Sequence, residues 1–234
     1  MSPSFANRSY EPERLDTGEY TDEEYSLWLR EMRRVNRLAG DGHALKHALA
    51  DRPLLLSNGR ISILDVGAGS GELLKIAKEA LAPGDTLLVG AELNPRAAKA
   101  IASRRLEFGV NSVHANAIQL PFADKAFDIV ICSLFLHHLT EEQGTSLLNE
   151  MSRVARQQII AIDLHRHPLA YHLYHTFSSL FLQRFTVEDG SLSILRSYRP
   201  DELQKLAETA RLCQPKIRRS FPFRLVLTAK PGKN

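Results

Sequence analysis

Residues 64–71, Leu-Asp-Val-Gly-Ala-Gly-Ser-Gly, place three glycines between a short apolar run and a helical pattern. A chain that leaves a strand and reverses into a helix needs residues without a Cβ atom, and the same residues let the backbone approach a ligand closely. A turn of this kind can also be purely structural. We interpret it as the strand–turn–helix unit of an α/β fold with a ligand at the turn.

The rest of the chain continues the alternation of strands and helices. Short apolar runs predict strands at residues 61–66, 86–92, 112–115, 127–132 and 158–163. Helical patterns follow at residues 72–81, 95–108 and 140–154. This order is typical of βαβ units with right-handed crossovers, which build a doubly wound sheet. A helix at residues 200–212 and a hairpin of strands at residues 216–220 and 223–229 close the chain.

Two segments fall outside this alternation. The polar first 20 residues predict an extended arm, and Thr21 with Glu24 forms a capping box that opens a helix, followed by a short helix at residues 43–49. Residues 164–198 are rich in histidine and aromatic side chains. We expect an N-terminal arm and helical cap at residues 1–59 and one domain at residues 60–234, with residues 164–198 as a lid or pocket insertion.

The net charge is small but unevenly distributed. Lys and Arg number 30 against 27 Asp and Glu, a net charge of +3. Residues 211–234 hold seven basic residues and no acid, which leaves 23 basic and 27 acidic residues, a net −4, for residues 1–210. A net positive charge is typical of proteins that bind nucleic acids. This excess, however, gathers in the closing strands, where we expect it to lie remote from the ligand cleft.

Composition excludes several classes of protein. The 44% hydrophobic and 24% charged residues are ordinary globular values, which exclude a disordered chain and a fibrous repeat. Cys132 and Cys213 are too few for a disulfide framework and are predicted to be reduced thiols. The N-terminus lacks an apolar signal segment, and no apolar run approaches the roughly 20 residues that span a bilayer. We expect a cytoplasmic protein without an integral membrane segment.

The acids around the glycine turn indicate what kind of ligand it holds. Glu72 stands where a dinucleotide-binding turn has its third glycine or an alanine, and an acid at a helix N-terminus is a poor neighbour for a pyrophosphate. Asp65 adds a second negative charge. Glu92 ends the second predicted strand, 21 residues after Gly71, where nucleotide-binding folds place an acid on ribose hydroxyls. The pattern favours a cationic or zwitterionic ligand over a diphosphate.

These segments, with residues 114–122 (His-Ala-Asn-Ala-Ile-Gln-Leu-Pro-Phe) and the strand at 127–132, resemble the class I S-adenosylmethionine-dependent methyltransferases. Within that family the pattern is similar to the small-molecule group that contains the quinone-biosynthesis methyltransferases. The resemblance covers about residues 60–163. It implies an α/β, Rossmann-like seven-stranded sheet of order 3-2-1-4-5-7-6 with the last strand antiparallel. It also implies S-adenosylmethionine as the cofactor.

The resemblance further implies where the cofactor binds. Residues 67–71 would wrap its methionine part, Glu92 would hold the ribose and Leu93 would pack on the adenine. Asn116 stands where the family usually has an Asp that accepts a hydrogen bond from the adenine amino group, and an Asn carbonyl can still accept one. The implied cofactor-binding residues are Asp65, Gly67, Ala68, Gly69, Gly71, Glu92, Leu93, Asn116, Ala117 and Ser133.

Histidines supply the candidate chemistry. Ligands of open α/β sheets bind beyond the carboxyl ends of the strands, here at residues 133–139 and 163–168. Methyl transfer needs an aligned acceptor, and a base assists a phenol. The predicted catalytic residues are His137, His138 and His165, each with a structural alternative as a packed or hydrogen-bonded histidine. Histidines 165, 167, 172 and 175 can also be read as metal ligands, but no Cys accompanies them, so we predict no metal.

The predicted acceptor side is apolar. Residues 133–136, Ser-Leu-Phe-Leu, lack the Asn/Asp-Pro-Pro-aromatic motif with which amino-directed nucleic-acid methyltransferases stack a base. The predicted substrate or lid residues are Arg37, Phe135, Tyr171 and Tyr174. We predict methyl transfer to oxygen of a hydroxylated, largely apolar or aromatic small molecule, by a monomer or homodimer without a nucleic-acid partner. The alternatives are an RNA methyltransferase and a non-catalytic, cofactor-binding regulatory subunit.

Overall fold

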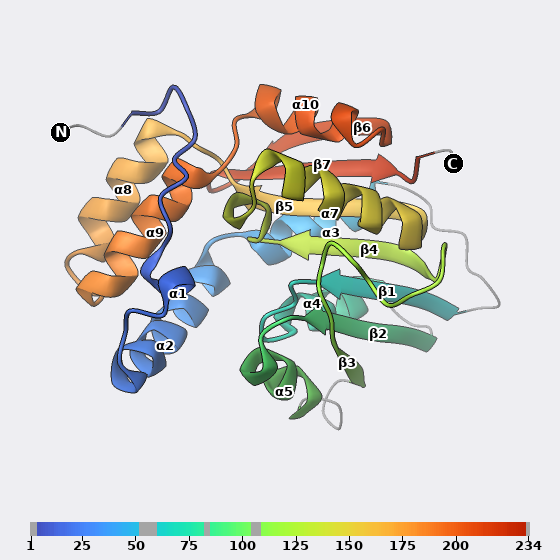
Figure 1. The fold of residues 1–234 in the computed structure, drawn as a ribbon, viewed down its shortest axis with the longest axis horizontal. Coiled ribbons are helices and arrows are strands. Elements are labelled where there is room, and N and C mark those ends of the chain that lie inside the picture. The colour runs from blue at the N-terminus through green and yellow to red at the C-terminus, as the bar shows by residue number, and fades with distance from the viewer. Residues whose placement is uncertain (1–3, 52–59, 82–84, 104–108, 233–234) are drawn as a thin grey trace.

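The computed structural model describes residues 4–51, 60–81, 85–103 and 109–232. Its centre is a seven-stranded sheet of order β3-β2-β1-β4-β5-β7-β6 (Figure 1). The first five strands pair in parallel, and β7 runs antiparallel between β5 and β6. The predicted fold class, strand order and antiparallel closing strand are confirmed. The strands are β1 (Arg60–Val66), β2 (Asp85–Glu92), β3 (Val110–His114), β4 (Phe127–Ser133), β5 (Ala155–Leu164), β6 (Cys213–Ser220) and β7 (Arg224–Lys230).

The central strands are apolar on both faces because helices cover both sides of the sheet. Successive side chains alternate between the faces. Ile63 and Ile129 belong to the core formed with α3 (Asp41–Ala50), α4 (Glu72–Ala80) and α5 (Pro95–Ser103). Leu64 and Val130 belong to the opposite core, formed with α7 (Glu141–Val154) and α10 (Pro200–Thr209). The helix predicted at residues 95–108 is described as far as Ser103, and residues 104–108 lie outside the described part of the chain.

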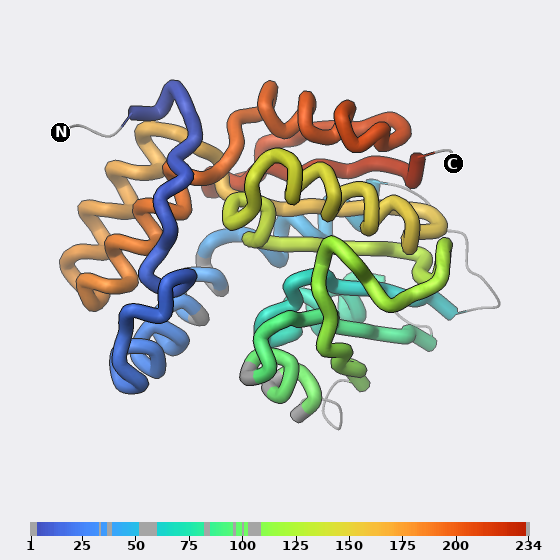
Figure 2. Tube along the Cα trace, viewed as in Figure 1, coloured from blue at the N-terminus to red at the C-terminus, as the bar shows by residue number. Residues whose placement is uncertain are grey.

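Four further helices gather beyond the carboxyl ends of the parallel strands, on the left of Figure 1. They are α1 (Arg14–Thr17), α2 (Asp22–Leu38), α8 (Pro168–Ser178) and α9 (Arg184–Arg196), and we refer to them as the helical cap. Figure 2 shows the N-terminal segment running beside α8 and α9, which come from the second half of the chain. The division at residue 60 stays a prediction. The structure shows that residues from both predicted parts pack together in this cap.

The entry into the cap is set by local hydrogen bonds. The predicted capping box is confirmed: Thr21 Oγ1 accepts from Glu24 N at 3.2 Å, and Glu24 Oε2 accepts from Thr21 N at 2.9 Å.

The sequence predicted an extended arm for the first 20 residues, but this segment contains the short helix α1. Its first N–H groups, of Arg14 and Leu15, donate to the Asp189 carboxylate of α9 at 2.9 and 3.0 Å. A distant side chain therefore stabilises this short helix.

The arm before α1 is docked by long-range contacts. Ser9 N donates to Leu195 O at 3.0 Å, and the Arg8 guanidinium lies 3.8 Å from the centre of the Tyr198 ring.

Both cysteines are free thiols. Among the described residues, no helix is both long and apolar enough to cross a membrane.

Asp128 joins β1 to β4 at the amino ends of these strands. Its Oδ2 accepts from the backbone N–H and the hydroxyl of Ser62 at 2.9 and 2.7 Å. Its Oδ1 accepts from Arg156 Nη1 at 2.6 Å and from Gln157 Nε2 at 2.9 Å. Burial alone would raise the pKa of Asp128, but the hydrogen bonds from Ser62, Gln157 and Arg156 bring it below its usual value.

We expect Asp128→Ala to lower the free energy of unfolding by about 2–4 kcal/mol, because it leaves buried donors without their acceptor. Since folding lowers the pKa of Asp128, its contribution is present at neutral pH and is lost as pH falls through the folded pKa. Urea unfolding of wild type and variant at pH 7 and in mild acid measures both effects. Ser62→Ala is the comparison, and it should lower the free energy of unfolding by a smaller amount than Asp128→Ala. Equal urea midpoints for wild type and Asp128→Ala would contradict the assignment.

Candidate active site

The glycine turn after β1 adopts a conformation that side chains disfavour. Gly67, Gly69 and Gly71 have φ angles of 71°, 53° and 72°, in the left-handed region. A Cβ atom on Gly67 would lie 3.1 Å from the Phe135 ring, whereas one on Gly69 would meet nothing within 4 Å. The turn therefore packs against the segment after β4 on one side and is open at Gly69.

Two carboxylates flank this turn. Asp65 is 2% exposed, and its Oδ1 has no hydrogen-bond partner among the described residues. Burial, and then the nearby charge of Glu92, raises the pKa of Asp65 well above its usual value. Glu92 lies at the end of β2, and its Oε2 accepts from Gly69 N at 2.9 Å. A ligand with a positive charge and hydrogen-bond donors would satisfy both acids.

The remaining residues of the predicted cofactor set lie at the same edge of the sheet. Leu93 follows β2 and is 59% exposed. The Oδ1 of Asn116 accepts from Ile118 N at 3.1 Å, so the carbonyl expected to meet adenine also closes a turn. Ala117 is buried, and the buried Ser133 hydroxyl has no partner among the described residues. Ala68 N donates to Ala91 O at 3.3 Å, which ties the turn to β2.

The turn after β4 carries a strained residue that the sequence did not reveal. Leu134 has a φ of 50°, uncommon for a residue with a branched side chain, and its N–H donates to Ile162 O at 2.9 Å. This backbone places Leu134 against a cavity and the next residue, Phe135, against Gly67. No glycine or asparagine marks the position, so the sequence carried no signal for it.

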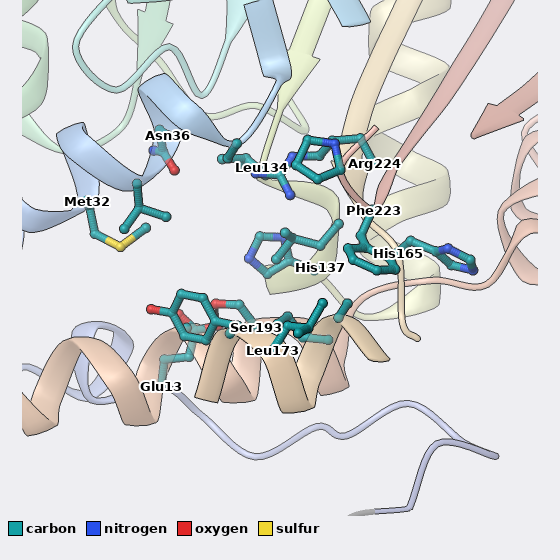
Figure 3. Close-up of a pocket in the computed structure, with 18 of the residues that line it drawn as sticks. Glu13, Met32, Asn36, Leu134, His137, His165, Leu173, Ser193, Phe223 and Arg224 are labelled. Carbon is teal, nitrogen blue, oxygen red and sulfur yellow. Dashed lines mark hydrogen bonds between the residues drawn. The ribbon is translucent and has the colours of Figure 1, made fainter. Parts of the chain in front are cut away.

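A cavity of about 380 Å³ lies between the helical cap and the carboxyl ends of β4 and β5 (Figure 3). We refer to it as the cap cavity. Its walls are mainly apolar, with a few polar side chains, as is typical of small-molecule sites. Apolar lining residues include Trp28, Met32, Val35, Leu134, Leu164, Leu173 and Phe223. Polar lining residues include Glu13, Asn36, His137, His138, His165, Tyr174, Ser193 and Arg224.

His137 and Asp163 form a buried pair at the wall of this cavity. His137 Nδ1 lies 2.6 Å from Asp163 Oδ1, and His137 N donates to Asp163 Oδ2 at 3.0 Å. Burial would raise the pKa of Asp163, but the charge and hydrogen bonds of His137 bring it below its usual value. Because the carboxylate only accepts, it keeps a proton on Nδ1, and in the neutral form of the ring Nε2 is then the acceptor.

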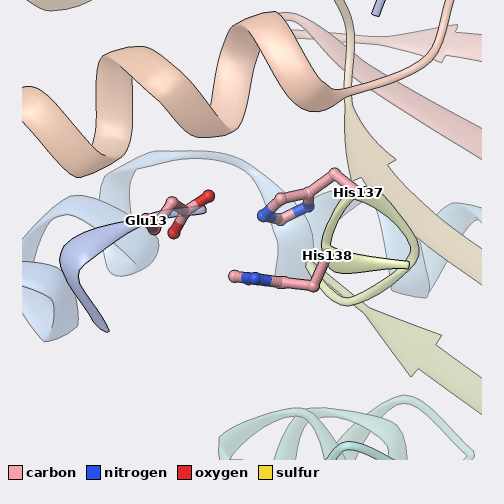
Figure 4. Close-up of side chains that lie close together, drawn as sticks. All are labelled: Glu13, His137 and His138. Carbon is pink, nitrogen blue, oxygen red and sulfur yellow. The ribbon is translucent and has the colours of Figure 1, made fainter. Parts of the chain in front are cut away.

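Glu13 brings a carboxylate from the N-terminal arm to the two adjacent histidines. Figure 4 shows the rings of His137 and His138 directed toward this carboxylate, and ligand atoms of the three residues lie within 4.8 Å of one another. Two histidines and a glutamate are a donor set that can hold zinc. Glu13 already accepts from Ser193 Oγ at 2.8 Å and lies 3.7 Å from the Arg196 guanidinium. Glu13 therefore belongs to a cluster of hydrogen-bonded and charged side chains.

Two arginines hold the backbone of the histidine turn, η1 (Leu136–His138). Arg8 Nη2 donates to Leu139 O at 3.1 Å, and Arg196 Nη2 donates to His138 O at 3.0 Å. Arg196 also donates to the carboxylate of Asp16 at 2.6 Å, which lies 3.3 Å from His138 Nδ1. Sequence reasoning missed Glu13, Arg8 and Arg196, because these contacts join residues 58 to 188 positions apart in the chain.

The two tyrosines predicted as substrate or lid residues lie in different surroundings. Tyr174 lines the cap cavity, and its hydroxyl donates to Thr186 O at 2.9 Å. Tyr171 is not among the residues that line it: its ring packs on Phe5 of the arm and stacks on His175. The assignment of Tyr171 as a substrate or lid residue stays a prediction. The side chain of Arg37 lies outside the described part of the structure.

His165 lines the cap cavity, but Figure 3 shows its ring on the far side of Phe223 from His137. Burial, and then the positive charges of His167, Arg219 and Arg166, lowers the pKa of His165 to about 4. Arg224, expected to lie remote from the site with the other C-terminal basic residues, lines the cavity and is paired with buried Asp41 at 2.6 Å. That expectation is therefore corrected for Arg224.

Known proteins are similar to this chain in sequence and in fold. Residues 63–158 match the methyltransferase domain family. The chain is 30% identical over 170 residues to the ubiquinone/menaquinone biosynthesis C-methyltransferase UbiE of Hahella chejuensis, a match that covers 65% of this chain and 67% of that protein. Other proteins of the same name match over 49% and 38% of their own length.

Two solved structures have a similar fold. The SAM-dependent methyltransferase from Aquifex aeolicus has a TM-score of 0.59 and 16% identity, over 84% of this chain and 96% of that one. Human N-acetylserotonin methyltransferase, in complex with SAM, has a TM-score of 0.61 and 16% identity, over 97% of this chain and 63% of that one. Sequence match, strand order and glycine turn agree, and the chain belongs to the class I S-adenosylmethionine-dependent methyltransferases.

Proposed function

We propose that this methyltransferase acts on an oxygen atom of a hydroxylated, largely apolar or aromatic small molecule. The observation that carries the proposal is the buried His137–Asp163 pair at the wall of an apolar cavity. Phe135 packs on the glycine turn while the preceding residue, Leu134, lines that cavity. The cofactor turn and the cavity therefore adjoin through two consecutive residues.

The residues at the turn fit S-adenosylmethionine. The unpartnered Oδ1 of Asp65 and the open side of Gly69 leave a negatively lined space beside the backbone. Glu92, at the end of β2, has the chemistry to accept two hydrogen bonds from a ribose diol. When bound, the cofactor supplies a methyl group already activated by its sulfonium, so the protein has to align the acceptor and exclude water.

His137 has the geometry of a general base. Its Nε2 can accept the proton of an acceptor hydroxyl, while Asp163 holds the ring in one tautomer and stabilises the imidazolium that forms. The deprotonated acceptor oxygen would be the nucleophile for the methyl group that the bound cofactor would supply. Trp28, Met32 and Val35 of α2 add apolar side chains to the lining of the cavity, which favours the exclusion of water.

Methylation at carbon is the second candidate. The relative from Hahella chejuensis is named as a C-methyltransferase of ubiquinone and menaquinone biosynthesis. The same base serves that reaction, because removal of a ring hydroxyl proton also makes the neighbouring ring carbon nucleophilic. Incubation with S-adenosylmethionine and a panel of phenols and hydroquinones, followed by NMR of the product, distinguishes an O-methyl from a C-methyl group. Absence of any methylated product across the panel would contradict the proposed function.

We expect Glu92→Ala to weaken S-adenosylmethionine binding by about 1–3 kcal/mol, through loss of hydrogen bonds to a charged acceptor. Isothermal titration measures the change. Glu79→Ala, which removes an exposed acid from α4, is the control and should bind like wild type. Equal affinity of Glu92→Ala and Glu79→Ala would show that Glu92 does not hold the ribose.

We expect Asp65→Asn to stabilise the ligand-free protein at pH 7 while weakening cofactor binding. Folding raises the pKa of Asp65, so its ionisation costs stability above the unfolded pKa of about 3.9, and the cost disappears below that pH. Thermal unfolding of both proteins between pH 4 and pH 7 tests the sign. Asp201→Asn, at an exposed carboxylate, is the control. A variant that melts below wild type at pH 7 would refute the reasoning.

We expect His137→Gln to lower kcat by about 10²–10⁴-fold, the usual contribution of a general base. S-adenosylmethionine affinity should change by less than about twofold, because His137 lies at the cavity and not at the glycine turn. Single-turnover kinetics with an acceptor from the panel measure the loss. His172→Gln, on an exposed residue of α8, is the matched control. A kcat of His137→Gln within threefold of wild type would exclude His137 as the base.

A further inference from the structure

A second pocket, of about 300 Å³, lies beside the cap cavity at the turn between β6 and β7. We refer to it as the β6–β7 pocket. Its polar lining consists of His165, His167, Arg219, Ser220 and Arg224. Phe221 and Phe223 complete the lining, so no carboxylate contributes to it. The pocket presents cations and hydrogen-bond donors.

The positive charge in this pocket is only partly neutralised. Arg224 is paired with buried Asp41. Arg166, which stands between the two histidines in the chain, is paired with Glu202. Arg219 is different, because no carboxylate of the described residues lies within 4.0 Å of its guanidinium. Its charge is therefore available to a ligand.

Each of the two histidines can supply a ring N–H donor here. His167 Nδ1 accepts from Leu169 N at 3.1 Å as the N-cap of α8, which leaves the proton on Nε2. His165 is 7% exposed and lies 5.4 Å from His167, ring centre to ring centre. Nothing in the proposed transfer step uses either ring. A cation, imidazole N–H groups and the Ser220 hydroxyl are together a set that recognises a carboxylate or a phosphate.

The two cavities share a wall. His165, Phe223 and Arg224 line both the cap cavity and the β6–β7 pocket. In Figure 3 the Phe223 ring lies between His137 and the ring of His165. A molecule whose hydroxyl meets His137 therefore needs only to extend past Phe223 to bring a second group to His165 and Arg219.

We propose that the β6–β7 pocket binds an anionic group, a carboxylate or a phosphate, carried by the methyl acceptor. This inference rests on the proposed function, since it assumes that the acceptor occupies the cap cavity. It narrows the substrate class to molecules with a hydroxylated apolar body and an acidic substituent at the other end. Arg219 determines this specificity without touching the reacting atoms.

The test compares acids with their esters. The probes are a homologous series of (4-hydroxyphenyl)alkanoic acids and their methyl esters, titrated by calorimetry into protein saturated with S-adenosylhomocysteine. For at least one chain length, the acid should bind about tenfold more tightly than its ester, a difference of about 1.4 kcal/mol. Arg219→Gln should abolish the difference and leave ester binding unchanged. Lys216→Gln, which removes an exposed charge from the same strand outside the pocket, should preserve it.

Each outcome decides between the proposals. Acids that bind no better than esters, or a preference that survives Arg219→Gln, would overturn the anion site while leaving methyl transfer intact. Inorganic phosphate, followed by the ring NMR signals of His165 and His167, serves as the second probe. Phosphate binding that depends on Arg219, with no preference for acids over esters, would assign the pocket to a free oxyanion and overturn the link to the acceptor. Failure of S-adenosylhomocysteine to bind would instead reject the proposed function.

Discussion

Asp163 is a carboxylate buried at the end of β5, and a buried carboxylate is stable only when charged or hydrogen-bonding groups satisfy its oxygens. His137 meets this requirement twice, through its backbone N–H and through Nδ1. The turn that follows β4 is thereby fixed in one position. Its carbonyl groups then become the acceptors for Arg8 and Arg196, so the docking of the arm and of α9 depends on the same carboxylate. The arrangement that positions the candidate base also closes the cavity around it.

Charge is divided between the two halves of the site. The glycine turn is flanked by Asp65 and Glu92, which suits a cationic cofactor. The far side of the cap cavity is bounded by Arg224 and, beyond Phe223, by Arg219. The net charge of +3 therefore says little by itself, since the acids and the bases that matter face different ligands. The basic residues of the closing strands do not form one remote patch, because two of them line cavities.

The sheet and the cofactor side could be predicted from the sequence because their signals are local. Apolar strands, a glycine turn and an acid at the next strand end lie within about 30 residues of one another, and the resemblance to a known family supplied the strand order. The cap could not be predicted in the same way. Glu13 reaches the histidines only because the arm docks on residues far along the chain, and Leu134 adopts a left-handed conformation that its side chain does not favour. Both features result from tertiary contacts, so no local sequence pattern predicts them.

The arm that covers the cap cavity has a consequence for exchange of ligands with solvent. Arg8 and the carbonyl of Arg196 that accepts from it are separated by 188 residues, and the arm is held by side-chain and backbone contacts without adding a strand to the sheet. We expect the closure of so long a loop to come late in folding, because its entropy cost is repaid only after the sheet and α9 exist. We expect the same segment to detach in a local opening of the native state, at a free energy below that of global unfolding. Such an opening would give ligands access to the cap cavity while the sheet stays folded, and hydrogen exchange at the amide of Ser9 would measure how often it occurs.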